Sequence, residues 1–111
     1  MNQQLTSTTF EISGYKIKKN LGIVRGIIVR SRSVFGNIGA AFQTLAGGNI
    51  TIYTELCEKT RADSFAQMMQ HADGLGANAV VGVRYDTTEI MSGVTEVICY
   101  GTAVIVEEDV K

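Results

Sequence analysis

The residues best suited to chemistry in this sequence are a cysteine and an arginine four positions apart, Cys57 and Arg61. On a helix, residues at this spacing are neighbours on one face. A guanidinium beside a thiol favours the thiolate, which is the nucleophile and the ligand for soft metal ions. In a second interpretation, Cys57 is a small buried apolar residue and Arg61 pairs with an acid such as Glu96 or one on a neighbouring subunit. We expect the second arrangement, with Cys57 packed against Phe65 and Tyr53.

Two glutamates near the end of the chain form another candidate site. If residues 92–93 make a two-residue turn, the flanking strands pair so that Glu89 lies opposite Glu96 and Tyr85 lies opposite Tyr100. Like charges that face each other destabilise a sheet, so a cation is expected beside them. That cation would be a hard metal ion or a basic side chain from the first half of the chain. A longer turn would separate the two carboxylates.

The other chemically active side chains predict no catalytic centre. The chain has one histidine, His71, and two cysteines, Cys57 and Cys99. Cys57 and His71 would lie about 21 Å apart on one helix, so they cannot act as nucleophile and base within a subunit. A structural zinc site needs four Cys or His ligands, and one subunit offers three such residues. We therefore expect no enzyme, and a divalent or heavy metal ion only where several subunits contribute ligands.

Residues 74–79, GLGANA, resemble the glycine pattern of a dinucleotide-binding loop. In such a loop the glycines follow a strand and begin a helix, so that the helix N-terminus faces the phosphates. Here they end a helical pattern and precede a strand. We therefore interpret Gly74 and Gly76 as a helix C-cap and a turn.

The elements that must position these residues predict an α+β fold with an antiparallel sheet. Residues 5–12 and 15–31 are rich in Thr, Ile and Val and flank a Ser-Gly turn, which predicts a first hairpin. Residues 78–91 and 94–106 predict a second hairpin by the same pattern. Three positions in the second strand of the first hairpin indicate a bulge or a close backbone approach: Asn20, Gly22 and Gly26.

Two helices are predicted between these hairpins. A short one begins after the N-cap Ser33 and ends before Gly47, and a long one runs from Thr51 to Asp73. The long helix has an apolar arc with Arg61 in the middle of it. The residues of this arc are Tyr53, Cys57, Phe65, Met68, Ala72 and Leu75.

The last strand predicts assembly, because both of its faces are apolar. The two helices can cover one face, which leaves the other for a neighbouring subunit. A mean hydropathy of +0.12 is also high for so small a chain. We expect a single domain over residues 1–111 that forms a homo-oligomer.

Charge is unevenly distributed, with six Lys or Arg and one acid in residues 1–50, against four and ten in residues 51–111. The first half could be a nucleic-acid footprint, but few aromatic residues accompany it and the pI of about 5.7 is acidic. We expect the two halves to pair instead, within or between subunits.

Two cysteines without a C-x-x-C motif predict reduced thiols in the cytoplasm. No apolar stretch is long enough for a membrane helix.

Several stretches together resemble the YbjQ-like family of small bacterial and archaeal proteins: GGNITIYTELCEKTR, LGANAVVGVRYD and YGTAVIV. The resemblance spans nearly the whole chain, and it departs from the family form at RGIIVRSRS and at Cys57. The resemblance implies a dodecin-like α+β fold whose subunits assemble into a pentameric ring. The family is labelled as heavy-metal binding. We interpret the protein as an oligomer that binds a small ligand or metal ion, with a purely structural oligomer as the alternative.

Overall fold

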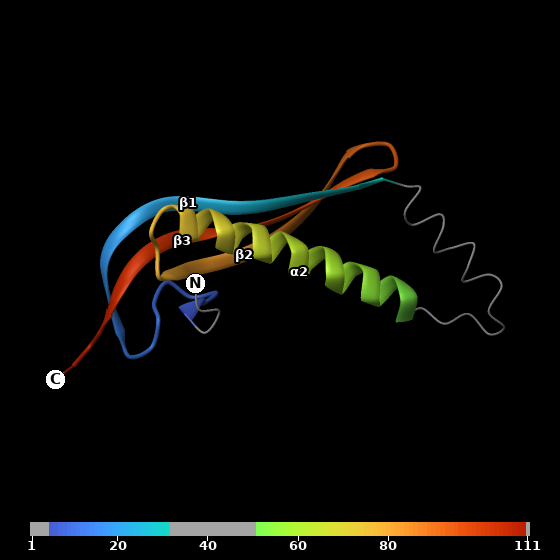
Figure 1. Cartoon of the computed structure of the whole chain (residues 1–111). Coiled ribbons are helices and arrows are strands. Elements are labelled where there is room, and N and C mark those ends of the chain that lie inside the picture. Colours follow the sequence, from blue (N-terminus) through green and yellow to red (C-terminus); the bar gives the residue numbers. More distant parts are fainter. Residues whose placement is uncertain (1–4, 32–50, 111) are drawn as a thin grey trace.

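The computed structural model describes residues 5–31 and 51–110. The short helix predicted after Ser33 lies outside the described residues. Within these described residues the elements follow one another as β1 (Tyr15–Ser31), α2 (Thr51–Gly74), β2 (Ala79–Met91) and β3 (Val94–Glu108). The strands form an antiparallel sheet in the order β1-β3-β2. Figure 1 shows α2 lying along one face of this long, curved sheet.

The predicted pairing of residues 5–12 with β1 is wrong, because β1 pairs with β3 along its whole length. Both edges of β3 are thereby occupied, by β1 and β2. The N-terminal segment instead lies beside β2, with a parallel bridge from Thr6 to Val80 and backbone hydrogen bonds that join Ser7 and Thr9 to residues 80–83, and it buries Ile12 against the sheet. The segment therefore pairs briefly with β2 and not with β1, and its apolar residue Ile12 covers a face of the sheet. The strands β2 and β3 are antiparallel neighbours joined at Ser92 and Gly93.

Strand β1 has both irregularities that its glycines predict. Its register with β3 shifts between Ile17 and Lys19 and again between Asn20 and Gly22, where Gly22 has a φ of 110°. At Gly26 the helix comes so close that a Cβ atom would overlap the backbone oxygen of Ser64. A bulge and a close backbone approach thus occur on the same strand.

The long helix is confirmed over Thr51–Gly74, and the GLGANA segment ends it. The amide of Gly76 donates to the carbonyl of Asp73 at 3.0 Å and that of Ala77 to the carbonyl of Ala72 at 3.1 Å. Gly76 has a φ of 83°, the left-handed conformation of a helix C-cap. The segment is therefore a cap followed by a strand, as predicted, and it lies at the C-terminal end of α2.

The buried face of α2 differs from the predicted apolar arc. Met68 and Ala72 are fully buried as expected, but the stripe continues through Ser64 and Thr60, whereas Cys57 is exposed. The close approach at Gly26 explains the shift, because it leaves room only for small side chains. The Ser64 hydroxyl donates to the carbonyl of Arg61 at 2.8 Å and that of Thr60 to Leu56 at 2.9 Å, so both are satisfied within the helix.

The helix also occupies backbone donors of the edge strand β1. His71 accepts a hydrogen bond at Nδ1 from the amide of Arg25 at 3.2 Å. Gln67 accepts one at Oε1 from the amide of Ile27 at 3.1 Å. An edge strand with free amides is a template for unwanted pairing, and these two bonds remove part of that template. His71 therefore has a structural role that its position in the sequence did not reveal.

The two faces of β3 are buried in different ways. Cys99 and Ala103 belong to a core beneath α2. Val104 and Val106 belong to a second core, on the opposite face, which the N-terminal segment covers through Ile12. The sequence analysis predicted that a neighbouring subunit covers this second face of β3. In the structure the N-terminal segment of the same chain covers part of it. Within the described residues, no helix has the length and apolar composition of a membrane span.

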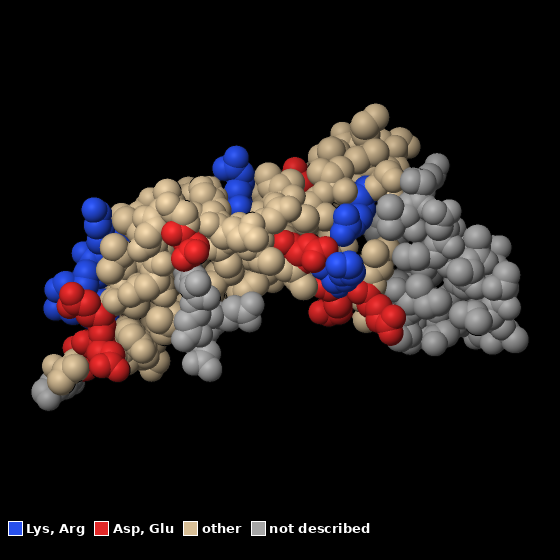
Figure 2. Space-filling view, in the orientation of Figure 1, with Lys and Arg blue, Asp and Glu red and all other residues tan. Residues whose placement is uncertain are grey.

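The charged halves of the sequence meet within the chain, as predicted. Lys18 in β1 lies 3.8 Å from Glu107 in β3. Arg30 at the other end of β1 lies 3.4 Å from Asp63 in α2. Figure 2 shows Lys or Arg and Asp or Glu side by side at the end of the sheet where β1 begins and β3 ends. These two ion pairs join basic residues of the first half of the sequence to acidic residues of the second half.

Candidate functional site

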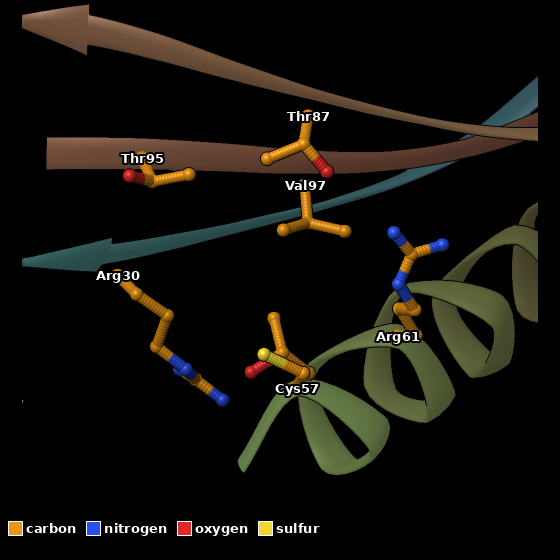
Figure 3. A pocket seen from close by; sticks show the side chains of 7 residues that line it. Arg30, Cys57, Arg61, Thr87, Thr95 and Val97 are labelled. Carbon is orange, nitrogen blue, oxygen red and sulfur yellow. The ribbon is translucent and has the colours of Figure 1, made fainter. Parts of the chain in front are cut away.

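A hollow of about 200 Å³ lies between the N-terminal half of α2 and the sheet. Figure 3 shows its walls, with Cys57 and Arg61 on the helix and Arg30 extending toward Cys57 from the sheet. All four described elements contribute to it. The lining residues are Arg30, Cys57, Thr60, Arg61, Thr87, Thr95 and Val97.

Strand register places the sheet residues of the hollow on one face. Thr95 in β3 lies opposite Arg30 in β1, and Val97 lies opposite Thr87 in β2. Opposed residues share a face of the sheet, and so do residues two apart on one strand. These four side chains therefore all point toward α2. Across the gap, Cys57 and Arg61 are one helical turn apart, so the thiol and the guanidinium enter the same space.

The predicted ion pair of Arg61 with Glu96 is not formed. Arg61 is exposed, and its guanidinium carbon lies 5.2 Å from the centre of the Tyr85 ring. The rotation of the buried stripe toward Ser64 is the reason, since it turns Arg61 out of the core. The arginine therefore stacks on an aromatic face at the border of the hollow, which is a cation–π arrangement.

Asp63 neutralises part of the charge of Arg30 and does not line the hollow. Its Oδ2 lies 3.4 Å from Nη2 of Arg30 and 3.3 Å from Nζ of Lys59. One carboxylate is thus shared by two cations. Among the described residues that line the hollow there are two arginines and no acid.

The two thiols are in opposite environments, and the expected burial of Cys57 is wrong. Cys57 is exposed and lines the hollow, while Cys99 is fully buried beneath α2. The sulfur of Cys99 lies 3.6 Å from that of Met68. Burial raises the pKa of the Cys99 thiol, because an apolar environment disfavours the thiolate. Cys57 is therefore the thiol that solvent and a ligand can reach.

The predicted pair of Glu89 and Glu96 is also wrong. A register shift between Glu89 and Met91 moves the pairing by one residue, so Glu89 lies opposite Thr95 and Glu96 opposite Thr88. A one-residue shift places two formerly opposed side chains on different faces of the sheet. The same shift sets Tyr85 opposite Cys99 and not opposite Tyr100. Glu89 shares the helix-facing side but does not line the hollow.

No group of three or more His, Cys, Asp or Glu that could hold a metal ion occurs among the residues that the structure describes. Within the described part of the chain, Cys57 is the single residue of these four types that lines the hollow. Sequence reasoning found Cys57 and Arg61 but missed Arg30, Thr60, Thr87 and Thr95 as parts of the site. Gly26 carries the signal that could have found Arg30, because the side chains of a strand alternate and these two positions share a face.

Comparison with known proteins gives a family but no chemistry. Residues 4–107 match a family described as "YbjQ_1: Putative heavy-metal-binding". A "UPF0145 protein" from Chromobacterium violaceum is 59% identical over 104 residues, which cover 94% of this chain and 89% of the relative. Another, from Solibacter usitatus, is 58% identical over 101 residues, 91% of this chain and 90% of the relative.

A solved structure shares the fold. It is a protein of unknown function from Pediococcus pentosaceus, described as a member of the DUF74 family, with a TM-score of 0.57 and 20% sequence identity. The match covers 92% of this chain and 96% of that one. At this identity the similarity concerns the fold alone. The sequence matches confirm the predicted family: the chain belongs to the YbjQ-like family, whose curated relatives bear the name UPF0145.

Proposed function

We propose that the protein is a homo-oligomer that binds a small ligand or ion in the hollow between α2 and the sheet. The hollow itself is the observation that carries this proposal. Its wall combines an apolar residue, Val97, with hydroxyls, a thiol and two guanidiniums that converge on one space. Polar groups placed beside an apolar residue in this way can fix the orientation of a small ligand.

Assembly is supported by the face of the sheet opposite α2. Ile23 is 74% exposed and Val29 is 50% exposed on this face, and their alternate neighbour Ile27 is only partly buried. Exposed apolar side chains grouped on one face favour an interface with another subunit. The proposal includes a dodecin-like subunit in a ring, a pentamer, as the family resemblance implies.

The cellular setting in this proposal is the cytoplasm. Cys57 and Cys99 are both free in the structure. Cytosolic conditions keep such thiols reduced, which the exposed Cys57 would need in order to act as a ligand.

A purely structural oligomer is the competing function, and one experiment separates the two. Native mass spectrometry of untagged protein reports the subunit number and any retained ligand or metal together. We expect an oligomer of the 12.0 kDa chain, and thermal unfolding that shifts upward with the retained species added back. A stable monomer at micromolar concentration would contradict the assembly. An oligomer without any bound species, whose melting temperature no candidate ligand raises, would support the structural function instead.

A further inference from the structure

We infer that the ligand of this hollow carries an anionic oxygen group, a carboxylate or phosphate, held by Arg30 and Arg61. This inference rests on the ligand binding proposed above and adds the chemical class of the ligand. Its basis is the charge of the wall, because the described residues that form it include two guanidiniums and no acid. Figure 3 shows both arginines at the border of the space that Cys57 faces.

Both arginines keep donors for a ligand. Arg30 contacts Asp63 through Nη2 at 3.4 Å, which leaves most of its five N–H groups unused by that ion pair. Arg61 lies with its guanidinium carbon over the Tyr85 ring, 5.2 Å from the ring centre, and this contact acts through the positive charge and supplies no carboxylate acceptor for its N–H groups. Among the described residues no carboxylate pairs with Arg61. A planar fork of free donors fits a carboxylate or phosphate oxygen.

The same charges argue against a bare metal cation in this hollow. A divalent ion at Cys57 would be repelled by two guanidiniums, and it would find one thiol where a zinc site needs three or four protein ligands. Glu89 lies on the helix-facing side opposite Thr95, but it does not line the hollow and supplies no second ligand. The hydroxyls of Thr87 and Thr95 suit an oxyanion better, because each has an O–H that can donate to it, whereas the Thr60 hydroxyl already donates to the carbonyl of Leu56.

Cys57 allows a direct test, because two alkylating reagents of similar shape differ only in charge. Iodoacetate carries a carboxylate and iodoacetamide a neutral amide. The rate with iodoacetate divided by the rate with iodoacetamide at the same thiol does not depend on the thiolate fraction, which is common to both rates. This ratio reports the local preference for an anion. We expect this ratio at Cys57 to be about tenfold higher in the native protein than in the unfolded chain. Arg61→Gln and Arg30→Gln should each lower the native ratio about threefold.

Lys59→Gln is the matched control for these variants. It removes one positive charge from the same helix, at a residue that does not line the hollow. We expect it to leave the ratio within about twofold of the parent. A native ratio equal to that of the unfolded chain would overturn the inference. So would a ratio that Lys59→Gln lowers as much as Arg61→Gln does.

A second measurement uses the protein without substitutions, so its outcome does not depend on whether a variant folds. Benzoate and inorganic phosphate should slow the labelling of Cys57 by iodoacetamide, whereas benzamide, the neutral analogue of benzoate, should not. Protection by phosphate and not by benzoate would identify a phosphate site, and the reverse a carboxylate site. Protection by benzamide or by zinc ions alone would overturn the anionic class and leave the proposed binding function standing. Protection by none of these, with no ligand retained in native mass spectrometry, would contradict both.

Discussion

The two ends of α2 meet the same sheet in opposite ways. Near its C-terminus the helix lies directly on β1, with Met68 and Ala72 fully buried and no room for a side chain at Gly26. Near its N-terminus the helix and the sheet enclose the hollow, and Cys57 and Arg61 are exposed. The residues of β1 that face the helix differ accordingly, from a glycine at the closed end to an arginine at the open end. The size of these side chains therefore determines where the interface can close.

The contacts at the closed end of α2 also determine how far the N-terminal half of the helix lies from the sheet. Gln67 and His71 hold α2 to β1 by hydrogen bonds from the amides of Ile27 and Arg25. Because a helix is stiff along its axis, anchoring its C-terminal half also positions the residues of the preceding turns. The thiol of Cys57 and the guanidinium of Arg61 are thus placed over the sheet by contacts that neither residue makes. The packing at Gly26 is therefore part of what forms the site.

The largest expected effect is a loss of stability when the closed end is forced apart. In Gly26→Val, the added side chain would meet the Ser64 oxygen and lie 2.7 Å from the backbone nitrogen of Met68, so the helix must move. We expect a loss of about 3 kcal/mol or more in the free energy of unfolding, measured by urea denaturation. The iodoacetate preference of Cys57 should fall in any fraction that remains folded.

Gly74→Ala is the control for this substitution. A Cβ atom at Gly74, the last residue of the helix, would meet nothing within 4 Å. We expect a change within about 1 kcal/mol, in the stabilising direction, because alanine has less conformational freedom to lose on folding. If Gly26→Val were as mild as Gly74→Ala, the closed end would be softer than its contacts indicate.

A smaller effect should appear at alkaline pH through the thiol of the closed end. Burial raises the pKa of Cys99 above its ordinary value of 9.0. A group whose pKa is raised on folding adds stability below its unfolded pKa, and this stability is lost as pH rises through the folded value. Tyr85, whose pKa is also raised by burial, acts in the same direction at still higher pH.

The measurement is the free energy of unfolding between about pH 7 and about pH 10. It should decline with pH in the parent, and the decline should be smaller in Cys99→Ala. The slope is compared and not the level, because Cys99→Ala also removes a packed sulfur. An equal slope in both proteins would mean that Cys99 does not titrate with folding.

Sequence patterns predicted the elements better than the surfaces between them. The long helix and its glycine cap depend on local spacing, and both were found within one residue of their observed limits. The first hairpin failed because a non-local competitor, β3, pairs with β1 in place of residues 5–12. The predicted pairing of Glu89 with Glu96 was wrong because the strand register shifts by one residue near the turn. Counting residues equally on both sides of the turn cannot reveal such a shift.

The candidate site was half predictable for a related reason. Spacing on one helix brought Cys57 and Arg61 together in the sequence and in the structure. The helix face was misassigned because apolarity was taken to mark burial, whereas the buried positions are the small residues Ser64 and Thr60 that satisfy their hydroxyls within the helix. Arg30 belongs to the site only through tertiary contact of β1 with α2.

The smallest expected effect concerns the stacking of Arg61 on Tyr85 at the open end. The sequence suggested a buried ion pair, whose loss would cost about 3–5 kcal/mol. An exposed guanidinium 5.2 Å from a ring centre predicts a coupling of roughly 0.5–1 kcal/mol instead. A double-mutant cycle of Arg61→Gln and Tyr85→Leu, read by urea unfolding, isolates this coupling from other contacts of either residue. Tyr85→Phe keeps the ring and should keep most of the coupling. A value of several kcal/mol would show that Arg61 is buried in the assembled protein, and a value of zero would show that the guanidinium is not held at the ring.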